Sequence, residues 1–98
     1  MNFKYELQFK DKALKEYKKL DPVIREQIKS KLEKILKNPH IEGNKLTGEL
    51  KDCYKIKLRK AGVRCVYKVE DKELIVLVLS IGKRDKNAVY ERAKNRVL

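Results

Sequence analysis

Two predicted strands lie in the stretch Cys53-Tyr-Lys-Ile-Lys-Leu-Arg-Lys-Ala-Gly-Val-Arg-Cys-Val-Tyr-Lys68, joined at Ala61-Gly62. Polarity alternates residue by residue on both sides of the join, which is typical of strands with one buried face. The apolar positions are Tyr54, Ile56 and Leu58 in the first strand and Val63, Cys65, Tyr67 and Val69 in the second. The opposite face of this hairpin carries five cations, namely Lys55, Lys57, Arg59, Arg64 and Lys68.

The apolar faces of paired strands must match, and this fixes the register of the hairpin up to even shifts. A two-residue turn at Ala61-Gly62, or a four-residue loop over 60–63, pairs Arg59 with Arg64, residue 57 with residue 66, and residue 55 with residue 68. A three-residue loop would set cations against the apolar face. Like charges directly opposite one another destabilise a sheet. The cationic face therefore predicts a polyanionic ligand; the alternative is a solvated face that happens to be basic.

Length and charge restrict the class of protein. The 98 residues suffice for one domain, 1–98, with one modest core. The 26 Lys and Arg residues exceed the 14 Asp and Glu residues, giving a net charge of +12, which favours nucleic acid or another acidic partner over a membrane. No long apolar run or signal-like segment is present, so we expect a cytoplasmic protein that contacts no membrane.

Cysteine and histidine usage gives no sign of a disulfide framework or a metal centre. Cys53 and Cys65 are predicted on opposite faces of the hairpin, too far apart to bridge. The only histidine is His40, which we expect on the surface of a polar loop over 40–51. No cofactor and no metal are therefore expected.

Helical and strand periodicities organise the rest of the chain. Residues 2–9, including Phe3, alternate as a half-buried strand. A short helix is predicted from Asp11, as N-cap, to Leu20, and a second from the cap Asp21 to Asn38-Pro39. Their apolar stripe should cover one sheet face. Their outer faces mix Lys15, Lys18, Lys19, Lys29, Lys31 and Lys34 with Glu16, Glu26 and Glu33, and are interpreted as ordinary solvated surface.

The C-terminal third brings further cations toward the hairpin. Residues 74–81 are continuously apolar, which predicts a strand buried on both faces inside the sheet. A tight turn at Asp71-Lys72 would pair Leu79 with Arg64, so residues 82–84 should leave the sheet beside Arg59 and Arg64. A last helix, capped by Asp85 or Asn87, is predicted to turn Ala88, Val89, Ala93 and Val97 to the core, with Tyr90 at its edge.

The remaining chemistry belongs to Lys, Arg and Tyr, because the sequence has no glycine-rich phosphate loop, nucleophile elbow, histidine pair or carboxylate cluster. RNA carries its own nucleophile, the 2′-hydroxyl, so a catalyst has only to align it, move protons and stabilise charge. Arg is suited to stabilise the negative charge that develops on the phosphate, and nearby cations lower the pKa of Tyr and Lys. Such a set can cleave RNA in principle.

Motifs along the chain resemble the RelE family of toxins. They are Ala-Leu-Lys-Glu at 13–16, Asn-Lys-Leu at 44–46, Asp-Cys-Tyr-Lys-Ile-Lys-Leu-Arg at 52–59, Val-Tyr at 66–67, Ile-Gly-Lys-Arg at 81–84 and Val-Tyr at 89–90. The resemblance implies an α+β domain, mainly an antiparallel four-stranded sheet, in the order strand, two helices, three strands, helix. It also implies a ribosome-dependent mRNA endonuclease that cuts the codon in the A site and leaves a 2′,3′-cyclic phosphate. A RelB-like antitoxin would block it, and the pair would repress its own promoter.

The resemblance also assigns roles to residues of this sequence. Catalysis would fall on Lys55, Lys57, Arg64, Arg84 and Tyr90, with the division of base and acid between Tyr90 and the lysines left open. RNA binding is predicted for Arg59, Lys68, Lys83 and Lys86. Thr47 stands where relatives often carry a basic residue, which puts ribosomal RNA contacts of that loop in doubt. We expect a free monomer with little activity on naked RNA.

Two alternatives remain at this point. A ParE-like relative would share the scaffold and inhibit DNA gyrase by binding; such proteins generally lack the Lys, Lys, Arg, Arg and Tyr set retained here. A basic RNA-binding module without chemistry is the other. Both alternatives predict that Tyr90→Phe has little effect.

Overall fold

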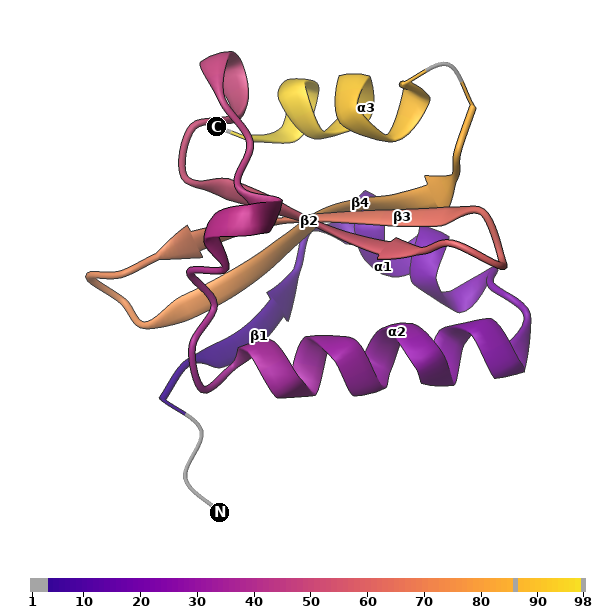
Figure 1. Ribbon diagram of the computed structural model, residues 1–98, viewed down its shortest axis with the longest axis horizontal. Coiled ribbons are helices and arrows are strands. Elements are labelled where there is room, and N and C mark those ends of the chain that lie inside the picture. Colours follow the sequence, from indigo (N-terminus) through magenta and orange to yellow (C-terminus); the bar gives the residue numbers. More distant parts are fainter. Residues whose placement is uncertain (1–3, 86, 98) are drawn as a thin grey trace.

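The computed structural model describes residues 4–85 and 87–97. Its elements are β1 (Glu6–Phe9), α1 (Asp11–Lys18), α2 (Pro22–Ile35), the 3₁₀ helices η1 (Glu42–Asn44) and η2 (Gly48–Leu50), β2 (Cys53–Leu58), β3 (Val63–Glu70), β4 (Ile75–Lys83) and α3 (Ala88–Arg96). The predicted α+β order is confirmed. Helices α1 and α2 cover one face of the sheet and α3 covers the other (Figure 1). Phe3, expected in the first strand, and Lys86 lie outside the described residues.

The four strands form one mixed sheet in the order β1-β4-β3-β2. Strand β1 runs parallel to β4, and the other two pairs are antiparallel, so the sheet is mainly antiparallel as predicted. Strand β4 lies between β1 and β3, which confirms its interior position. The interior position explains why β4 is apolar on both faces: α1 packs against one face of the strand and α3 against the other.

The predicted faces of the β2–β3 hairpin are right, but the predicted register is wrong by two residues. Lys57 pairs with Arg64, not with Val66, and Leu58 pairs with Val63. The connection is a four-residue turn over 59–62, in which Gly62 takes the left-handed φ of +66° and its amide donates to the carbonyl of Arg59. This longer turn leaves Arg59 outside the ladder, and thereby avoids an Arg59–Arg64 pair.

The predicted pairing of Leu79 with Arg64 is also wrong. The β3–β4 turn spans residues 71–74, with Leu74 at φ +56°, and a bulge lies at Val66/Tyr67. Arg64 consequently pairs with Gly82, and β4 continues to Lys83. Strand β4 is therefore longer than the predicted 74–81 at the end where the cations gather.

Only some of the helix caps predicted from the sequence are observed in the structure. The carboxylate of Asp21 caps α2 by accepting from the amide of Val23, as predicted. The predicted cap of α1, Asp11, lies instead inside the first turn, and Lys10 occupies the cap position, where its side chain does not cap the helix. Asn87 occupies the cap position of α3 at a left-handed φ of +66°, and its side chain makes no capping hydrogen bond. A left-handed Asn87 turns the chain sharply, so that α3 folds back over the sheet.

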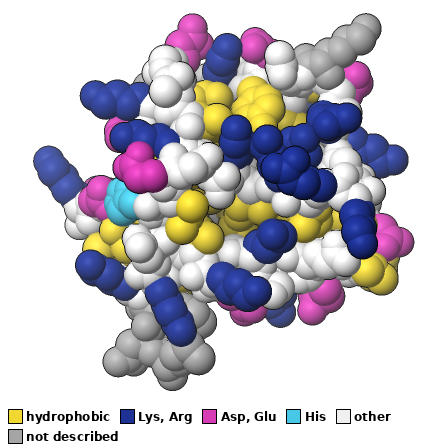
Figure 2. Space-filling view, in the orientation of Figure 1, with side chains coloured by type: hydrophobic (Ala, Val, Ile, Leu, Met, Phe, Trp, Pro, Cys, Tyr) yellow, Lys and Arg dark blue, Asp and Glu magenta, His cyan; other side chains and the backbone are white. Residues whose placement is uncertain are grey.

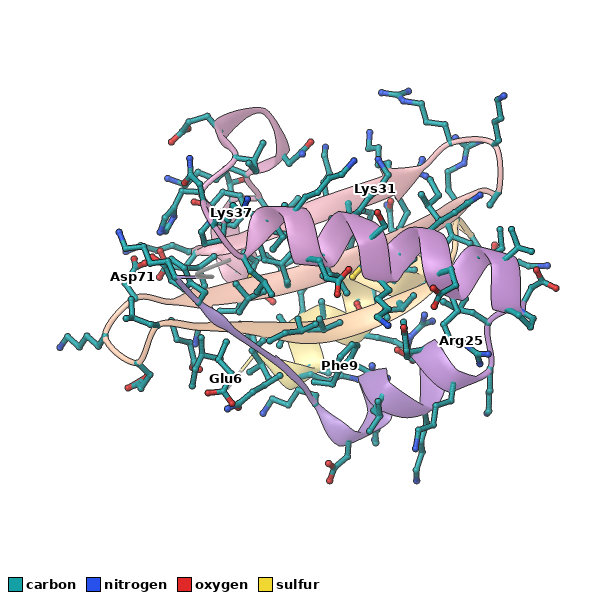
Figure 3. The ribbon with its side chains drawn as sticks, turned by 90° about the horizontal axis from the view of Figure 1, so that it is seen from below. Glu6, Phe9, Arg25, Lys31, Lys37 and Asp71 are labelled. Atoms are coloured by element: carbon teal, nitrogen blue, oxygen red, sulfur yellow. The ribbon has the colours of Figure 1, made fainter. Side chains whose placement is uncertain are left out.

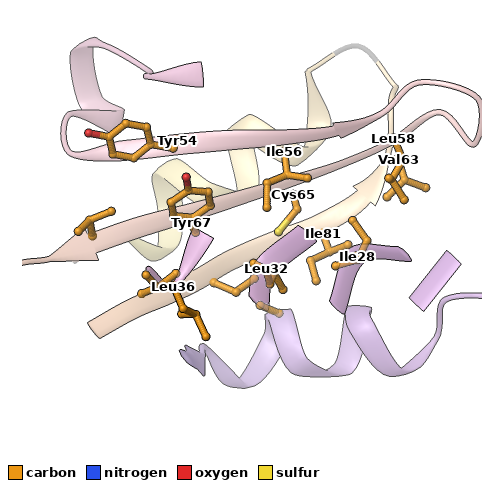
Figure 4. Close-up of a cluster of buried hydrophobic side chains, with 14 of the residues drawn as sticks. Ile28, Leu32, Leu36, Tyr54, Ile56, Leu58, Val63, Cys65, Tyr67 and Ile81 are labelled. Atoms are coloured by element: carbon orange, nitrogen blue, oxygen red, sulfur yellow. The ribbon is translucent and has the colours of Figure 1, made fainter. Parts of the chain in front are cut away.

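Two apolar cores lie on the two faces of the sheet. The larger packs α2, through Ile28 and Leu32, against Ile56, Cys65 and Tyr67 of the hairpin (Figure 4). Figure 3 shows α2 crossing this side of the sheet. The smaller core lies under α3 and joins Leu50, Cys53, Val66, Leu79, Val89 and Ala93. Cys53 and Cys65 are thus buried in different cores, which confirms their predicted placement on opposite faces of the hairpin.

Candidate functional site

The candidate site begins with a row of three residues across the sheet. Lys57 of β2 pairs with Arg64 of β3, which pairs with Gly82 of β4. Arg84 follows two residues later, and its amide donates to the carbonyl of Gly62 at 2.6 Å. Arg84 therefore leaves the sheet beside the β2–β3 turn, as the strand pattern predicted. Alternation places Arg84 on the same face as Gly82.

Helix α3 adds Tyr90 to this group. A small hollow of about 20 Å³ is lined by Arg64 and Arg84 from the sheet and by Tyr90 from the first turn of α3; Asp85, Asn87, Ala88 and Val89 complete it. The ring of Tyr90 is half-buried and packs against the smaller core. The sequence pattern alone left Tyr90 at the helix edge, and the structure places it next to the two arginines.

Arg64 is the most unusual residue of the site. It is buried, with 7% of its surface exposed, and its side chain makes one hydrogen bond among the described residues, a 3.5 Å contact from Nη1 to the carbonyl of Val63. In the part of the chain that the structure describes, no carboxylate lies within 4.0 Å of Arg64, Arg84, Lys55 or Lys57. A buried cation without a counter-ion is costly, which makes this position a strong attractor for an anion.

Crowding of cations lowers the pKa of one lysine. The ammonium of Lys55 lowers the pKa of Lys57 below its usual value, and slight burial and the charges of Arg59 and Arg64 lower it further. Lys55 lies two residues before Lys57 on β2, so the two side chains share a face. Lys57 is consequently easier to deprotonate than an isolated surface lysine.

The other predicted RNA contacts do not all join this group. Arg59 is exposed in the β2–β3 turn next to Lys57. Lys68 lies about 13 Å along β3 from Arg64, under the end of α3, where its Nζ contacts Glu70 and the carbonyl of Val97. Lys83 lies on the opposite face, in a groove with Lys19, Asp21 and Ile24. The predicted continuous basic face is therefore interrupted by α3.

Helix α2 contributes cations that the sequence interpretation treated as plain surface. Lys31 lines a groove with Lys57 and Arg59 along the outer edge of β2, and Lys34 extends it toward Ile41. Figure 2 shows Lys and Arg side chains over the middle of the face that carries β2, with acidic side chains mainly at its margin. Helical spacing places Lys31 and Lys34 on one face of α2, but nothing in the spacing says that this face borders β2.

Cations and the phenol of Tyr90 dominate the site, and Asp85 adds a carboxylate to the lining of the hollow. No group of three or more His, Cys, Asp or Glu side chains within 4–85 and 87–97 could hold a metal. Over the same residues no helix is long and apolar enough to cross a membrane. Fold and site together define a small basic α+β protein with a cluster of cations at one end of its sheet.

Comparisons with known proteins place this architecture in a family. The family model described as ParE toxin of type II toxin-antitoxin system, parDE, matches residues 7–88. The mRNA interferase toxin RelE of Escherichia coli K12 is 51% identical over 94 residues, covering 96% of this chain and 98% of that protein. A free mutant form of E. coli RelE has 50% identity and a TM-score of 0.88, covering 96% of this chain and 98% of that one. The E. coli RelBE toxin-antitoxin complex has 51% identity and a TM-score of 0.80, covering 84% and 99%. The chain therefore belongs to the RelE/ParE family of toxins.

Proposed function

We propose that this chain is the toxin of a type II toxin–antitoxin system and an endoribonuclease that cleaves mRNA in the ribosomal A site. One observation supports the proposal above all others: Arg64, Arg84 and Tyr90 line one hollow, Lys57 lies beside it, and among the described residues no carboxylate oxygen lies within 4.0 Å of these cations. The relatives named mRNA interferase, at 51% identity, favour RNA as the anion.

The reaction needs no group beyond those of the chain and its substrate. The 2′-oxygen of the RNA forms a bond to the neighbouring phosphorus, and the bond from phosphorus to the 5′-oxygen breaks. One side chain removes the 2′-proton and another protonates the leaving 5′-oxygen, so the products are a 2′,3′-cyclic phosphate and a 5′-hydroxyl. The planar guanidinium of Arg64 would hold the non-bridging oxygens, where charge builds up. Arg84, which lines the same hollow, would stabilise the same charge.

Proton transfer falls to Lys57, Lys55 or Tyr90. Lys57 is suited to accept a proton because Lys55 lowers its pKa. Lys55 would bind phosphate. Tyr90, next to both arginines, would stack on a base of the codon and could exchange a proton through its hydroxyl.

A RelB-like antitoxin is the proposed partner. The E. coli RelE structures include complexes with RelB and with a RelB peptide. An antitoxin that covers the cationic end would block RNA by competing for the same charges. Operator DNA would be contacted only through the toxin–antitoxin complex. In the free toxin, Arg59 would join Lys57 in binding ribosomal RNA or mRNA.

The test is to map the 5′ ends of a defined mRNA after incubation with the protein, with and without ribosomes that carry an empty A site. The proposal predicts cuts confined to the A-site codon, absent from naked mRNA and lost with Arg84→Ala. The matched control is Lys72→Ala, which removes an equal charge from the β3–β4 turn at the far end of the sheet. Cutting of naked mRNA at many positions would contradict ribosome dependence, and equal cutting by the Arg84→Ala protein would contradict the site.

The family model's own description names ParE, which keeps gyrase inhibition as a second candidate. A supercoiling assay with purified DNA gyrase distinguishes the two. Inhibition of supercoiling together with intact mRNA on programmed ribosomes would replace the nuclease proposal. Cleavage without inhibition is the result that we expect.

A further inference from the structure

Part of the outer edge of β4 is closed by side chains instead of a strand. Strand β1 pairs with β4 only over Ile75–Val78. Beyond that point the amide of Ile81 donates to Oε1 of Glu16 at 3.0 Å, and its carbonyl accepts from Nη2 of Arg92 at 3.2 Å. The carbonyl of Leu79 accepts from Nη1 of Arg96 at 3.0 Å. Three charged side chains therefore satisfy the backbone groups that a neighbouring strand would otherwise bind.

The same three side chains connect helices on opposite faces of the sheet. Glu16 belongs to α1, whereas Arg92 and Arg96 belong to α3. Arg96 donates to both oxygens of Glu16, at 2.9 and 3.0 Å, in a bidentate pair. Arg92 Nε lies 2.9 Å from Oε2, a charge contact without hydrogen-bond alignment. We refer to Glu16, Arg92 and Arg96 as the clasp.

The clasp is ionic, and the Arg96–Glu16 pair within it is largely shielded from solvent, whereas the side chain of Arg92 is 36% exposed. The side chains of Arg96 and Glu16 are only 14% and 21% exposed. Burial by itself raises the pKa of Glu16, but the hydrogen bonds from Arg96 and Ile81 and the charge of Arg92 outweigh burial and hold the pKa below its usual value. Glu16 is therefore a carboxylate at neutral pH. Its interpretation as ordinary solvated surface is wrong.

Gly82 of β4 leaves the space in which the side chain of Arg92 lies. A Cβ atom at Gly82 would collide with Nη2 of Arg92 and touch Val89. The absence of a side chain at this position lets Arg92 lie across the strand to reach Ile81. Gly82 is also the β4 partner of Arg64, so the clasp lies next to the row that carries the site.

We propose that Glu16 is a positioning residue: through the clasp it fixes the placement of α3, and α3 in turn holds Tyr90 against Arg64 and Arg84. Arg92 follows Tyr90 by two residues, so the clasp anchors the same short helix. At nine residues, α3 is too short to be stable by itself. Its position depends on tertiary contacts, namely the clasp, the bond from Ser80 Oγ to the carbonyl of Val89, and the small apolar core.

The substitution Glu16→Gln tests this inference, because it keeps an oxygen for the amide of Ile81 and removes the charge that holds both arginines. The matched control is Glu33→Gln, which removes the same charge from an exposed position on α2. Arg96→Met opens the clasp from the other side and serves if Glu16→Gln does not fold.

The first measurement is ¹⁹F NMR of protein labelled with 3-fluorotyrosine, in which the Tyr90 signal is assigned by its loss in Tyr90→Phe. We expect Glu16→Gln and Arg96→Met to move the Tyr90 signal toward that of free 3-fluorotyrosine, and Glu33→Gln to leave it in place. The signals of Tyr54 and Tyr67, in the opposite core, should not move. An unchanged Tyr90 signal in both clasp variants would overturn the proposal.

The second measurement rests on the proposed function. In single-turnover cleavage on programmed ribosomes, we expect about a 10- to 100-fold slower cut at saturating toxin, with ribosome affinity unchanged, because a displacement of about 1 Å is enough for such a loss. The Glu16→Gln, Arg96→Met double variant should be no slower than either single variant, because both open one clasp. Fully additive losses would overturn the proposal. If the unsubstituted protein cuts nothing, the proposed function fails, and the Tyr90 signal still decides the role of the clasp.

Discussion

Replacing Arg64 by methionine should lower activity without lowering stability. Arg64 is 7% exposed and, among the described residues, lacks a carboxylate partner. Methionine has a similar length and removes the cost of holding an unpaired charge away from water. Replacement of buried ionic groups by apolar ones is often neutral or stabilising by about 1–4 kcal/mol. Because part of the guanidinium reaches the hollow, we expect the lower end, about 0–2 kcal/mol of added stability.

The effect on cleavage should be far larger and of opposite sign. Loss of one preorganised donor to a developing oxyanion raises the barrier by about 2.7–4 kcal/mol, which is about a 10²- to 10³-fold slower reaction. Arg64→Lys should recover little of this, because an ammonium cannot replace a planar, two-pronged donor.

The assay pairs urea unfolding followed by circular dichroism with single-turnover cleavage on programmed ribosomes. Val66→Ala, on the same strand and in the small core, is the matched control, because it should lose stability through a cavity without losing charge. If Arg64→Met unfolds at clearly lower urea than the unsubstituted protein, and cleavage falls only with the folded fraction, Arg64 is a structural residue and the argument from its missing partner is refuted.

Three further predictions concern protonation, backbone and thiols. Lys55→Gln removes the main cause of the lowered pKa of Lys57 and should therefore raise that pKa. If Lys57 is the general base, the rising limb of the pH–rate profile should move to higher pH, and an unmoved limb would exclude that role. Gly82→Ala should stay folded and lose about 1 kcal/mol in urea unfolding, since it displaces only the end of Arg92 and its bond to Ile81, whereas a loss above about 3 kcal/mol would mean that the backbone cannot accept a side chain there. Burial raises the pKa of Cys53 to about 11 and that of Cys65 further, so neither thiol should react with Ellman's reagent at pH 8 before unfolding; fast reaction of the native protein would contradict their placement in the cores.

The faces of the strands could be predicted from the sequence, but their register could not. Alternation with period two is intrinsic to a strand, so residues such as Ile56 and Cys65 fell on the correct side. Register depends on the length of the turn, and a glycine with positive φ serves a two-residue turn or the last position of a four-residue one. Gly62 took the second role. The sequence pattern did not predict that β4 continues to Lys83. Because Lys83 is part of the strand, alternation places its side chain on the face opposite Arg84, away from the predicted RNA-binding group.

Of the candidate site, the pattern supplied the lysines and arginines, and the family resemblance supplied Tyr90. Side-chain networks between distant segments could not be predicted from the sequence. Glu16 is 80 residues from Arg96, and no periodicity connects them. His40, correctly expected on the surface, bridges the hydroxyl of Tyr54 and the carboxylate of Asp71, each at 2.8 Å, in a network that also holds Tyr5. Such contacts depend on loop paths that local patterns do not encode.

The central claim is that a site of cations and a tyrosine cleaves RNA by using the 2′-hydroxyl of its substrate. The most direct measurement compares two mRNAs on ribosomes with an empty A site, identical except that one carries a single 2′-deoxynucleotide on the 5′ side of the cut. We predict full cleavage of the all-ribose mRNA, a 2′,3′-cyclic phosphate on its upstream product, and no cleavage at the deoxy position. Equal cleavage of both mRNAs would show that water or another nucleophile attacks the phosphate, and would contradict the account.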